Sequence, residues 1–197
     1  MKKPDIIAAL DMVIRCFEKL GIAYYIGGSV ASSAYGIARA TMDVDLVADV
    51  KMNQVDHLVK ALEADYYINT ATIKEAIHKR ISFNLIHLAT MIKIDVFIVR
   101  QQPYDSEAFA RRRSDTLDED SSDRFYLSTA EDVILNKLRW YQQGGGVSEQ
   151  QWKDVLGVMK VQSNKLDLEY LKFWASRLTL SDLLNRSFND AGITGRS

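Results

Sequence analysis

Apolar residues near the start of the chain recur with the spacing of one helix face: Ile6, Ile7, Leu10, Val13, Phe17 and Leu20. Pro4 stands near the beginning of this segment and Gly21 just past its end, and both residue types favour helix boundaries there. The pattern predicts a first helix between them. A short β-prone run at 22–26 follows and ends at Gly27 and Gly28.

The rest of the first hundred residues alternates between the apolar spacing of helices and that of strands. Residues 29–35 are typical of a short helix that Gly36 ends, and the acid–apolar alternation at 43–48 predicts a half-buried strand. The other elements expected here are a helix capped by Asn53, a helix at 72–79, and strands at 81–88 and 92–99 with a turn at 89–91. Helices interleaved with about four strands indicate an α+β (α/β) fold with a small mixed sheet.

The second half of the chain has helical patterns. Residues 101–124 are polar and predict a helix leading into an exposed loop. Two capping-box matches, Ser128 with Glu131 and Ser148 with Gln151, predict helices at 130–143 and 152–161. Further helices are expected at 168–178 and 181–191. We therefore expect an α/β domain at 1–125 and a helical domain at 126–197.

Composition narrows the function classes. The chain has 197 residues, is 47% hydrophobic and carries a net charge of −1, so a core is expected but no global basic field for nucleic acid. Cys16 is the only cysteine, which excludes a disulfide or a cysteine-based zinc site within one chain. No apolar run reaches membrane-spanning length or resembles a signal peptide, so we expect a cytoplasmic protein without a membrane partner.

Three acids carry the candidate chemistry. Asp43 and Asp45 alternate along one strand and so share a face, and Asp95 lies within the apolar run 94–99. Carboxylates this close repel each other unless a cation lies between them, and Mg²⁺ or Mn²⁺ prefers such oxygen ligands together with substrate phosphates. Three acids could hold two metal ions, one orienting a triphosphate and the other activating a hydroxyl.

Gly27, Gly28 and Ser29 could supply the phosphate-binding end of this site. Glycine permits close backbone approach, and a turn that enters a helix presents free N–H groups to an anion. Alone, a Gly-Gly-Ser is usually a turn and an Asp-x-Asp is usually a strand end or a cap. The succession of strand, turn, helix, paired acids and a third acid in an apolar strand is more specific.

The run from Ile26 to Ser29, the acids Asp43 and Asp45 and the downstream Asp95 resemble the signature of the DNA polymerase β-like nucleotidyltransferase superfamily. Residues 128–138 and 151–157 resemble the helical part of the AbiEii-type nucleotidyltransferases, which include toxins of toxin–antitoxin systems. The resemblance covers roughly residues 20 to 185. It departs from that subgroup in size, because this chain lacks the long C-terminal region of the larger toxins.

The resemblance implies a role for each matching residue. Asp43, Asp45 and Asp95 would bind metal, and Asp95 could activate the acceptor. Gly27, Gly28, Ser29 and Lys137 would bind the triphosphate of an NTP, and Asp154 would complete the pocket, with Lys153 a weaker candidate. Lys93, on the same strand face as Asp95, is a further phosphate candidate.

Several of these residues have simpler interpretations. Lys137 and Asp154 could each be a solvated residue on an amphipathic helix. Arg39 and Thr41 could contact a phosphate or base, or Arg39 could be a surface charge. The basic cluster Arg111–Arg113 could hold an RNA acceptor, but a solvated helix end balanced by Asp118–Asp120 is the more common case.

Three functions from different classes remain. The first is a Mg²⁺-dependent nucleotidyltransferase that moves a nucleoside monophosphate from an NTP to a hydroxyl on RNA, protein or a small molecule. The second is a catalytically silent relative that binds nucleotide or a partner protein, such as a cognate antitoxin. The third is an antibiotic-type small-molecule nucleotidyltransferase, for which the near-neutral charge is slightly favourable.

Overall fold

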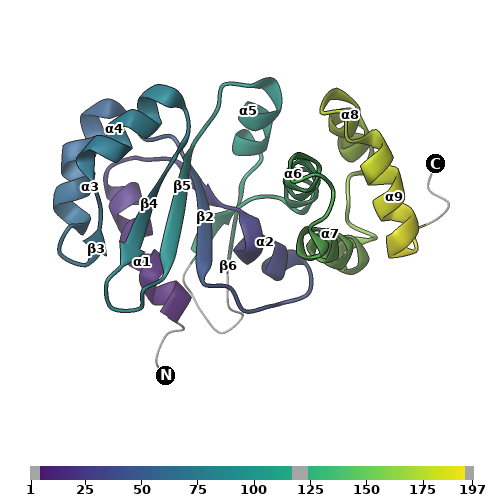
Figure 1. The fold of residues 1–197 in the computed structure, drawn as a ribbon, viewed down its shortest axis with the longest axis horizontal. Helices are drawn as coiled ribbons and strands as arrows, with labels where there is room; N and C mark the ends of the chain where they lie inside the picture. The colour runs from purple at the N-terminus through teal and green to yellow at the C-terminus, as the bar shows by residue number, and fades with distance from the viewer. Residues whose placement is uncertain (1–4, 117–123, 194–197) are drawn as a thin grey trace. The chain divides into compact units, whose positions relative to one another are not determined.

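The computed structural model describes residues 5–116 and 124–193 (Figure 1). Pro4 and the acidic stretch Asp118–Asp120 lie outside these residues. The helices are α1 (Asp5–Lys19), α2 (Gly28–Tyr35), η1 (Met52–Gln54), α3 (Val55–Leu62), α4 (Thr70–Lys79), α5 (Pro103–Ala110), α6 (Ala130–Gln143), α7 (Glu149–Gln162), α8 (Leu168–Arg177) and α9 (Ser181–Ala191). The strands are β1 (Tyr24–Ile26), β2 (Asp43–Ala48), β3 (Tyr66–Tyr67), β4 (Ser82–His87), β5 (Lys93–Ile98), β6 (Arg113–Thr116) and β7 (Arg124–Leu127).

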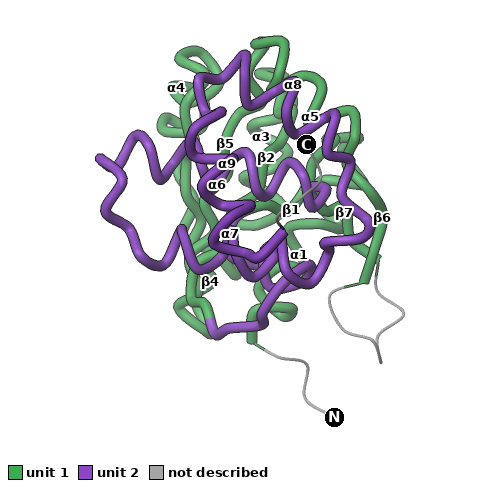
Figure 2. Tube along the Cα trace, turned by 90° about the vertical axis from the view of Figure 1, so that its right-hand side faces the viewer, with its two compact units in different colours: residues 1–27, 41–127 green, residues 28–40, 128–197 purple. Residues whose placement is uncertain are grey.

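Contacts between residues divide the chain into two compact units (Figure 2). Unit 1 contains residues 1–27 and 41–127, and unit 2 contains residues 28–40 and 128–197. The chain therefore crosses between the units at 27–28, at 40–41 and at 127–128. Residues 28–40 belong to unit 2 because α2 packs against α6 and α7.

Unit 1 is built on a mixed sheet. Among the described residues its strand order is β3-β4-β5-β2-β1-β7-β6. The pairs β2–β5 and β1–β7 are parallel, and the other neighbouring pairs are antiparallel. The predicted α+β fold with a mixed sheet is thus confirmed. The strands β3, β6 and β7 were not predicted, because two are very short or polar and all lie towards the sheet edges.

The core of unit 1 explains which face of the central strands carries the acids. Along β2 and β5 alternate side chains are buried: Val44, Leu46, Ala48, Ile94, Val96 and Ile98. The helix α1 packs its apolar face towards the sheet, with Phe17 against Tyr24 of β1 at a centroid distance of 6.0 Å. The phenol of Tyr66 donates to the carbonyl of Ala9 at 2.7 Å and ties β3 to α1. The side chains between the buried ones must then point to the opposite, more open face.

Unit 2 is a bundle in which α2 packs against α6 and α7, and in which α8 and α9 extend the packing. The loop after α2 passes very close to α7: a Cβ on Gly36 would lie 2.8 Å from the Val158 backbone nitrogen. The side-chain amide of Gln162 donates to the Tyr35 carbonyl at 2.9 Å. Buried Asp132 accepts a hydrogen bond from the Tyr170 hydroxyl at 2.7 Å, which links α6 to α8. Among the described residues no helix combines the length and apolar character needed to cross a bilayer.

Two predicted helix caps are wrong. Asn53 lies inside the 3-10 turn η1, so Gln54 precedes α3 in its place. Thr129, not Ser128, caps α6, because its hydroxyl accepts from the Asp132 backbone N–H. The cap at Ser148 is confirmed, since its hydroxyl accepts from the Gln151 N–H.

Candidate functional site

The three acids lie on one face of two neighbouring strands, and we call Asp43, Asp45 and Asp95 the acid face. The parallel register of β2 and β5 aligns Asp45 with Asp95 and Asp43 with Lys93. Although Asp95 lies within an apolar run, its side chain is 23% exposed, and that of Asp43 is 62% exposed. The acid face is therefore open to solvent while its strands are anchored by the core on the other side.

Hydrogen bonds fix the start and the middle of β2. The Thr41 hydroxyl donates to the Asp43 carbonyl at 3.1 Å, and the Asp43 backbone N–H donates to the Thr41 hydroxyl oxygen at 3.3 Å. The Gly27 backbone N–H donates to the Asp45 carbonyl at 2.8 Å. The end of β1 and the middle of β2 are thus held together where the acids begin.

Lys93 forms ion pairs with two of these acids. Its ammonium nitrogen lies 2.8 Å from Oδ2 of Asp95 and 3.9 Å from Oδ1 of Asp43. The hydrogen bond to Asp95, and then the charges of Asp95, Asp43 and Asp45, raise the pKa of Lys93 above its usual value.

The acid face has the donor chemistry of a divalent-cation site. Mg²⁺ takes one or two carboxylates together with phosphate oxygens, and the aligned pair Asp45 and Asp95 can supply them. Within residues 5–116 and 124–193, no three His, Cys, Asp or Glu side chains are grouped so that they could hold a metal ion as they stand. The acid face offers an aligned pair of carboxylates to a cation, and a site with three carboxylate ligands would require side chains to move.

Of the two glycines in the predicted Gly-Gly-Ser motif, Gly28 is the one whose backbone conformation requires glycine. Its φ is +53°, a left-handed conformation that side-chain-bearing residues rarely adopt, at the first residue of α2. Gly27 has no such constraint, because a Cβ there would meet only the Tyr25 ring, at ordinary contact distance. Ser29 follows within the first turn of α2, where backbone N–H groups are not used by the helix itself.

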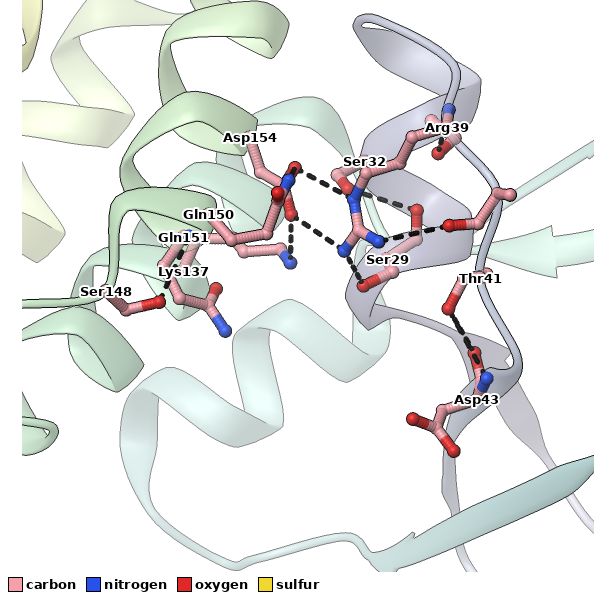
Figure 3. A network of polar contacts seen from close by, with 12 residues as sticks. Ser29, Ser32, Arg39, Thr41, Asp43, Lys137, Ser148, Gln150, Gln151 and Asp154 are labelled. Carbon is pink, nitrogen blue, oxygen red and sulfur yellow. Dashed lines mark hydrogen bonds and ion pairs between the residues drawn. The ribbon is translucent and has the colours of Figure 1, made fainter.

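A second group of charged residues lies within unit 2, and we call it the Arg39 cluster: Arg39, Ser29, Lys137, Gln150 and Asp154. Figure 3 shows the Arg39 guanidinium between Ser29 and Asp154. Its Nε and one terminal nitrogen donate to the two Asp154 oxygens at 3.2 and 3.3 Å, and that same terminal nitrogen also donates to the Ser29 hydroxyl. This is a two-point pairing that fixes the orientation of the guanidinium.

Asp154 also receives two hydrogen bonds from α6 and α7. The Lys137 ammonium donates to Oδ2 at 2.7 Å and the Gln150 amide donates to Oδ1 at 2.8 Å. The side chains of Lys137 and Asp154 are each only 6% exposed. Burial by itself would raise the pKa of Asp154, but the hydrogen bonds from Arg39, Lys137 and Gln150 and the charge of Lys137 lower it below its usual value.

The structure corrects the simpler interpretations of these residues. Neither Lys137 nor Asp154 is a solvated residue on a helix face. Lys153 does not join the cluster, because it is exposed and pairs with Glu149. Arg112 packs against the rings of Phe109 and Tyr126, so the basic run Arg111–Arg113 is partly structural.

Sequence reasoning missed the part that Arg39 and Gln150 have in this cluster. Gln150 stands four residues before Asp154 on α7, a spacing that brings side chains together on a helix and could have indicated the pair. Arg39 stands 115 positions from its partner Asp154, a separation that no local pattern reveals.

Comparisons with known proteins bear on the fold. No family model matches the chain, and no curated protein matches its sequence. The solution structure of the antibiotic-resistance factor ANT(2'')-Ia is similar over 94% of this chain and 94% of that one, with a TM-score of 0.58 and 12% identity.

Two further solved structures show the same likeness. ANT(2'')-Ia in complex with adenylyl-2''-tobramycin matches 89% of this chain and 98% of its own, with a TM-score of 0.57 and 10% identity. An antigenic nucleotidyltransferase-like protein from Paracoccidioides brasiliensis matches 91% of each chain, with a TM-score of 0.54 and 19% identity. The chain therefore has a nucleotidyltransferase fold, and the AbiEii-type subgroup stays a prediction.

Proposed function

We propose that this protein is a nucleotidyltransferase that moves a nucleoside monophosphate from an NTP to a hydroxyl-bearing acceptor. The observation that carries the proposal is the acid face: three carboxylates on one open face of two parallel strands, with Asp45 and Asp95 aligned. The fold shared with ANT(2'')-Ia and the nucleotidyltransferase-like protein supports it.

The chemistry requires little from the protein beyond position and charge. The acceptor oxygen attacks the α-phosphorus and forms a new P–O bond, the bond from the α-phosphorus to the bridging oxygen breaks, and pyrophosphate leaves. Asp95 accepts the proton of the acceptor hydroxyl. Asp45 and Asp95, with Asp43 if it moves, would hold Mg²⁺ or Mn²⁺, which would supply charge neutralisation for the phosphates.

The Arg39 cluster supplies the anion-binding part of the proposal. Two cationic side chains, Arg39 and Lys137, share the single carboxylate of Asp154, so the cluster keeps an excess of positive charge. Arg39 also holds the Ser29 hydroxyl in the first turn of α2, where backbone N–H groups favour an anion. These groups, together with Gly28, would bind the triphosphate.

The proposal is tested by incubating the purified protein with each of four NTPs labelled at the α-phosphate, Mg²⁺ and a cell extract. We expect a labelled product with at least one NTP, and none from the double variant Asp43→Ala/Asp45→Ala. Equal labelling by the double variant, or no labelled product from the wild type, would refute it. Pyrophosphate release in the same reactions distinguishes transfer from binding alone.

A second candidate concerns the acceptor, and the structural likeness to ANT(2'')-Ia with adenylyl-2''-tobramycin favours it. The acceptor would be a small hydroxyl-bearing antibiotic, and the protein would inactivate it by nucleotidylation. Incubation with ATP, Mg²⁺ and a panel of aminoglycosides should then give a mass increase of one nucleotidyl group. Labelling only of an RNA or protein in extract would rule this candidate out.

A role in a toxin–antitoxin pair rests on the sequence resemblance of 128–138 and 151–157. If it holds, expression of the wild type should arrest growth and Asp45→Asn should not, and co-expression of a cognate antitoxin should relieve the arrest. Growth that is equal for wild type and variant would argue against this role while leaving the transfer reaction open.

A further inference from the structure

Lys93 lies beside the acid face. It begins β5, in register with Asp43 across the strand pair, and precedes Asp95 by two residues on the same face. Its ammonium contacts one carboxylate on each strand, at 2.8 Å to Asp95 and 3.9 Å to Asp43. A single side chain thus bridges two of the three acids.

This contact offsets the repulsion that the acid face would otherwise suffer. Three carboxylates on one face disfavour one another's charged forms, and a cation among them relieves this. The Lys93 ammonium therefore places a positive charge beside Asp43 and Asp95, in the place where a metal ligand set is expected.

We propose that Lys93 is an internal counter-ion of the acid face, and that a divalent cation displaces its ammonium from Asp43 and Asp95 when it binds. This inference rests on the proposed function. The Lys93 side chain is 42% exposed and its head group is carried on a flexible four-carbon stem, so it can turn into solvent. Lys93 would then be a positioning residue that keeps the two acids in place and sets the threshold for metal binding.

The alternative is that Lys93 binds a substrate phosphate, as its place on the strand also allows. The two roles differ in a measurement that contains no nucleotide. A counter-ion competes with the metal itself, because it occupies the same carboxylates and repels the incoming charge. A phosphate ligand affects metal binding only when the triphosphate is present.

The test is the affinity of the full chain for Mn²⁺ alone, measured by calorimetry and by the electron paramagnetic resonance signal of free Mn²⁺. We expect Lys93→Met to bind Mn²⁺ about tenfold more tightly than the wild type, and Lys93→Arg to remain within about twofold of it. Lys51→Met is the matched control: Lys51 also pairs with an Asp two residues away, Asp49, at 2.7 Å in unit 1. It should leave the affinity unchanged.

Thermal stability gives a second measurement that does not depend on catalysis. In EDTA, Lys93→Met should melt at a lower temperature than the wild type, because the three carboxylates lose their cation. Saturating Mn²⁺ should raise its melting temperature by more than it raises that of the wild type. Asp45→Asn should weaken Mn²⁺ binding in both backgrounds.

The outcomes separate this inference from the proposed function. If the wild type transfers nucleotide and binds Mn²⁺, and Lys93→Met binds it equally or more weakly, the counter-ion role is refuted. A Lys93→Met defect confined to NTP affinity likewise refutes it and assigns Lys93 to phosphate. If neither protein binds Mn²⁺ and the wild type transfers nothing, the proposed function and this inference fall together.

Discussion

The acid face of unit 1 and the Arg39 cluster of unit 2 are both groups of charged side chains, but they differ in sign and in setting. On the acid face two of the three carboxylates pair with one lysine, and the Asp43 and Asp95 side chains are partly open to solvent. In the Arg39 cluster two cations share one carboxylate, and Lys137 and Asp154 are buried. Each group keeps an excess of one charge sign, negative on the acid face and positive in the Arg39 cluster.

The two groups also differ in how firmly they are held. Asp154 accepts from three side chains, so its geometry is fixed by hydrogen bonds from α6, α7 and the loop after α2. The acids are positioned mainly by the strands that carry them. We therefore expect changes in the Arg39 cluster to lower stability, and changes on the acid face to lower activity with little effect on stability.

The largest expected effect is on the reaction rate. Asp95→Asn removes the proposed proton acceptor and should lower the transfer rate by about 10²–10⁴-fold. Initial rates of transfer from α-labelled NTP measure this, with the melting temperature as a check on folding. Asp49→Asn changes another carboxylate of unit 1 that pairs with a lysine, and it should keep the wild-type rate. Equal losses in both variants would contradict the role of Asp95.

Asp154→Asn should lower the free energy of unfolding by about 3 kcal/mol at pH 7, because it leaves buried Lys137 and its neighbour Arg39 without a carboxylate. The pKa of Asp154 is lowered in the folded protein, so its contribution is complete above the usual carboxyl pKa of 3.8 and is lost as the pH falls below it. Urea denaturation at pH 7 and pH 3.5 should show the gap between wild type and variant shrinking in acid.

Glu149→Gln is the matched control, since Glu149 is an exposed acid on the same helix. Its effect at pH 7 should stay within about 0.5 kcal/mol. A loss for Asp154→Asn no larger than that of the control would show that the Arg39 cluster contributes little to stability.

The sequence predicts the acid face better than it predicts the Arg39 cluster, and the reason is physical. The alternation at 43–48 and the apolar run around Asp95 gave both strands, because a strand with one buried face shows a period of two. The Arg39 cluster joins residues from three separate segments, and no period connects Arg39 with Asp154. The pairing of Lys137 with Asp154 could not be predicted for the same reason, because Asp154 belongs to a different helix.

Strands β6 and β7 show a second limit of local patterns. Residues 113–116 carry almost no apolar side chains, and their pairing with β7 depends on the partner strand. The caps at Gln54 and Thr129 were misplaced by one residue, which is the usual uncertainty of helix ends.

Glycine substitutions in the two units should change the free energy of unfolding by smaller amounts. Gly36→Ala should lower the free energy of unfolding by about 2 kcal/mol, since its Cβ would lie 2.8 Å from the Val158 backbone nitrogen on α7. Gly27→Ala should cost less than about 1 kcal/mol, because its Cβ would meet only the Tyr25 ring at 3.5 Å. Thermal denaturation of both variants measures the difference, and equal losses would contradict the close approach at Gly36.

The smallest effect is expected for a substitution that keeps the positive charge but removes the planar guanidinium group. Arg39→Lys retains the cation and loses the two-point pairing with Asp154, so the KM for NTP should rise about tenfold while kcat changes less. Steady-state kinetics with varied NTP separate the two constants. Arg15→Lys, at an exposed pair with Asp11, is the control and should change neither. A fall in kcat with an unchanged KM would assign Arg39 to a different step.

The most direct test of the central claim follows the fate of the label from two forms of the same NTP. One carries the radioactive phosphate at the α-position and the other at the γ-position, and each is incubated with the protein, Mg²⁺ and an acceptor mixture. Nucleotidyl transfer predicts α-label in the acceptor and γ-label in pyrophosphate. Transfer of γ-label to the acceptor, or α-label that remains entirely in free nucleotide, would contradict the account.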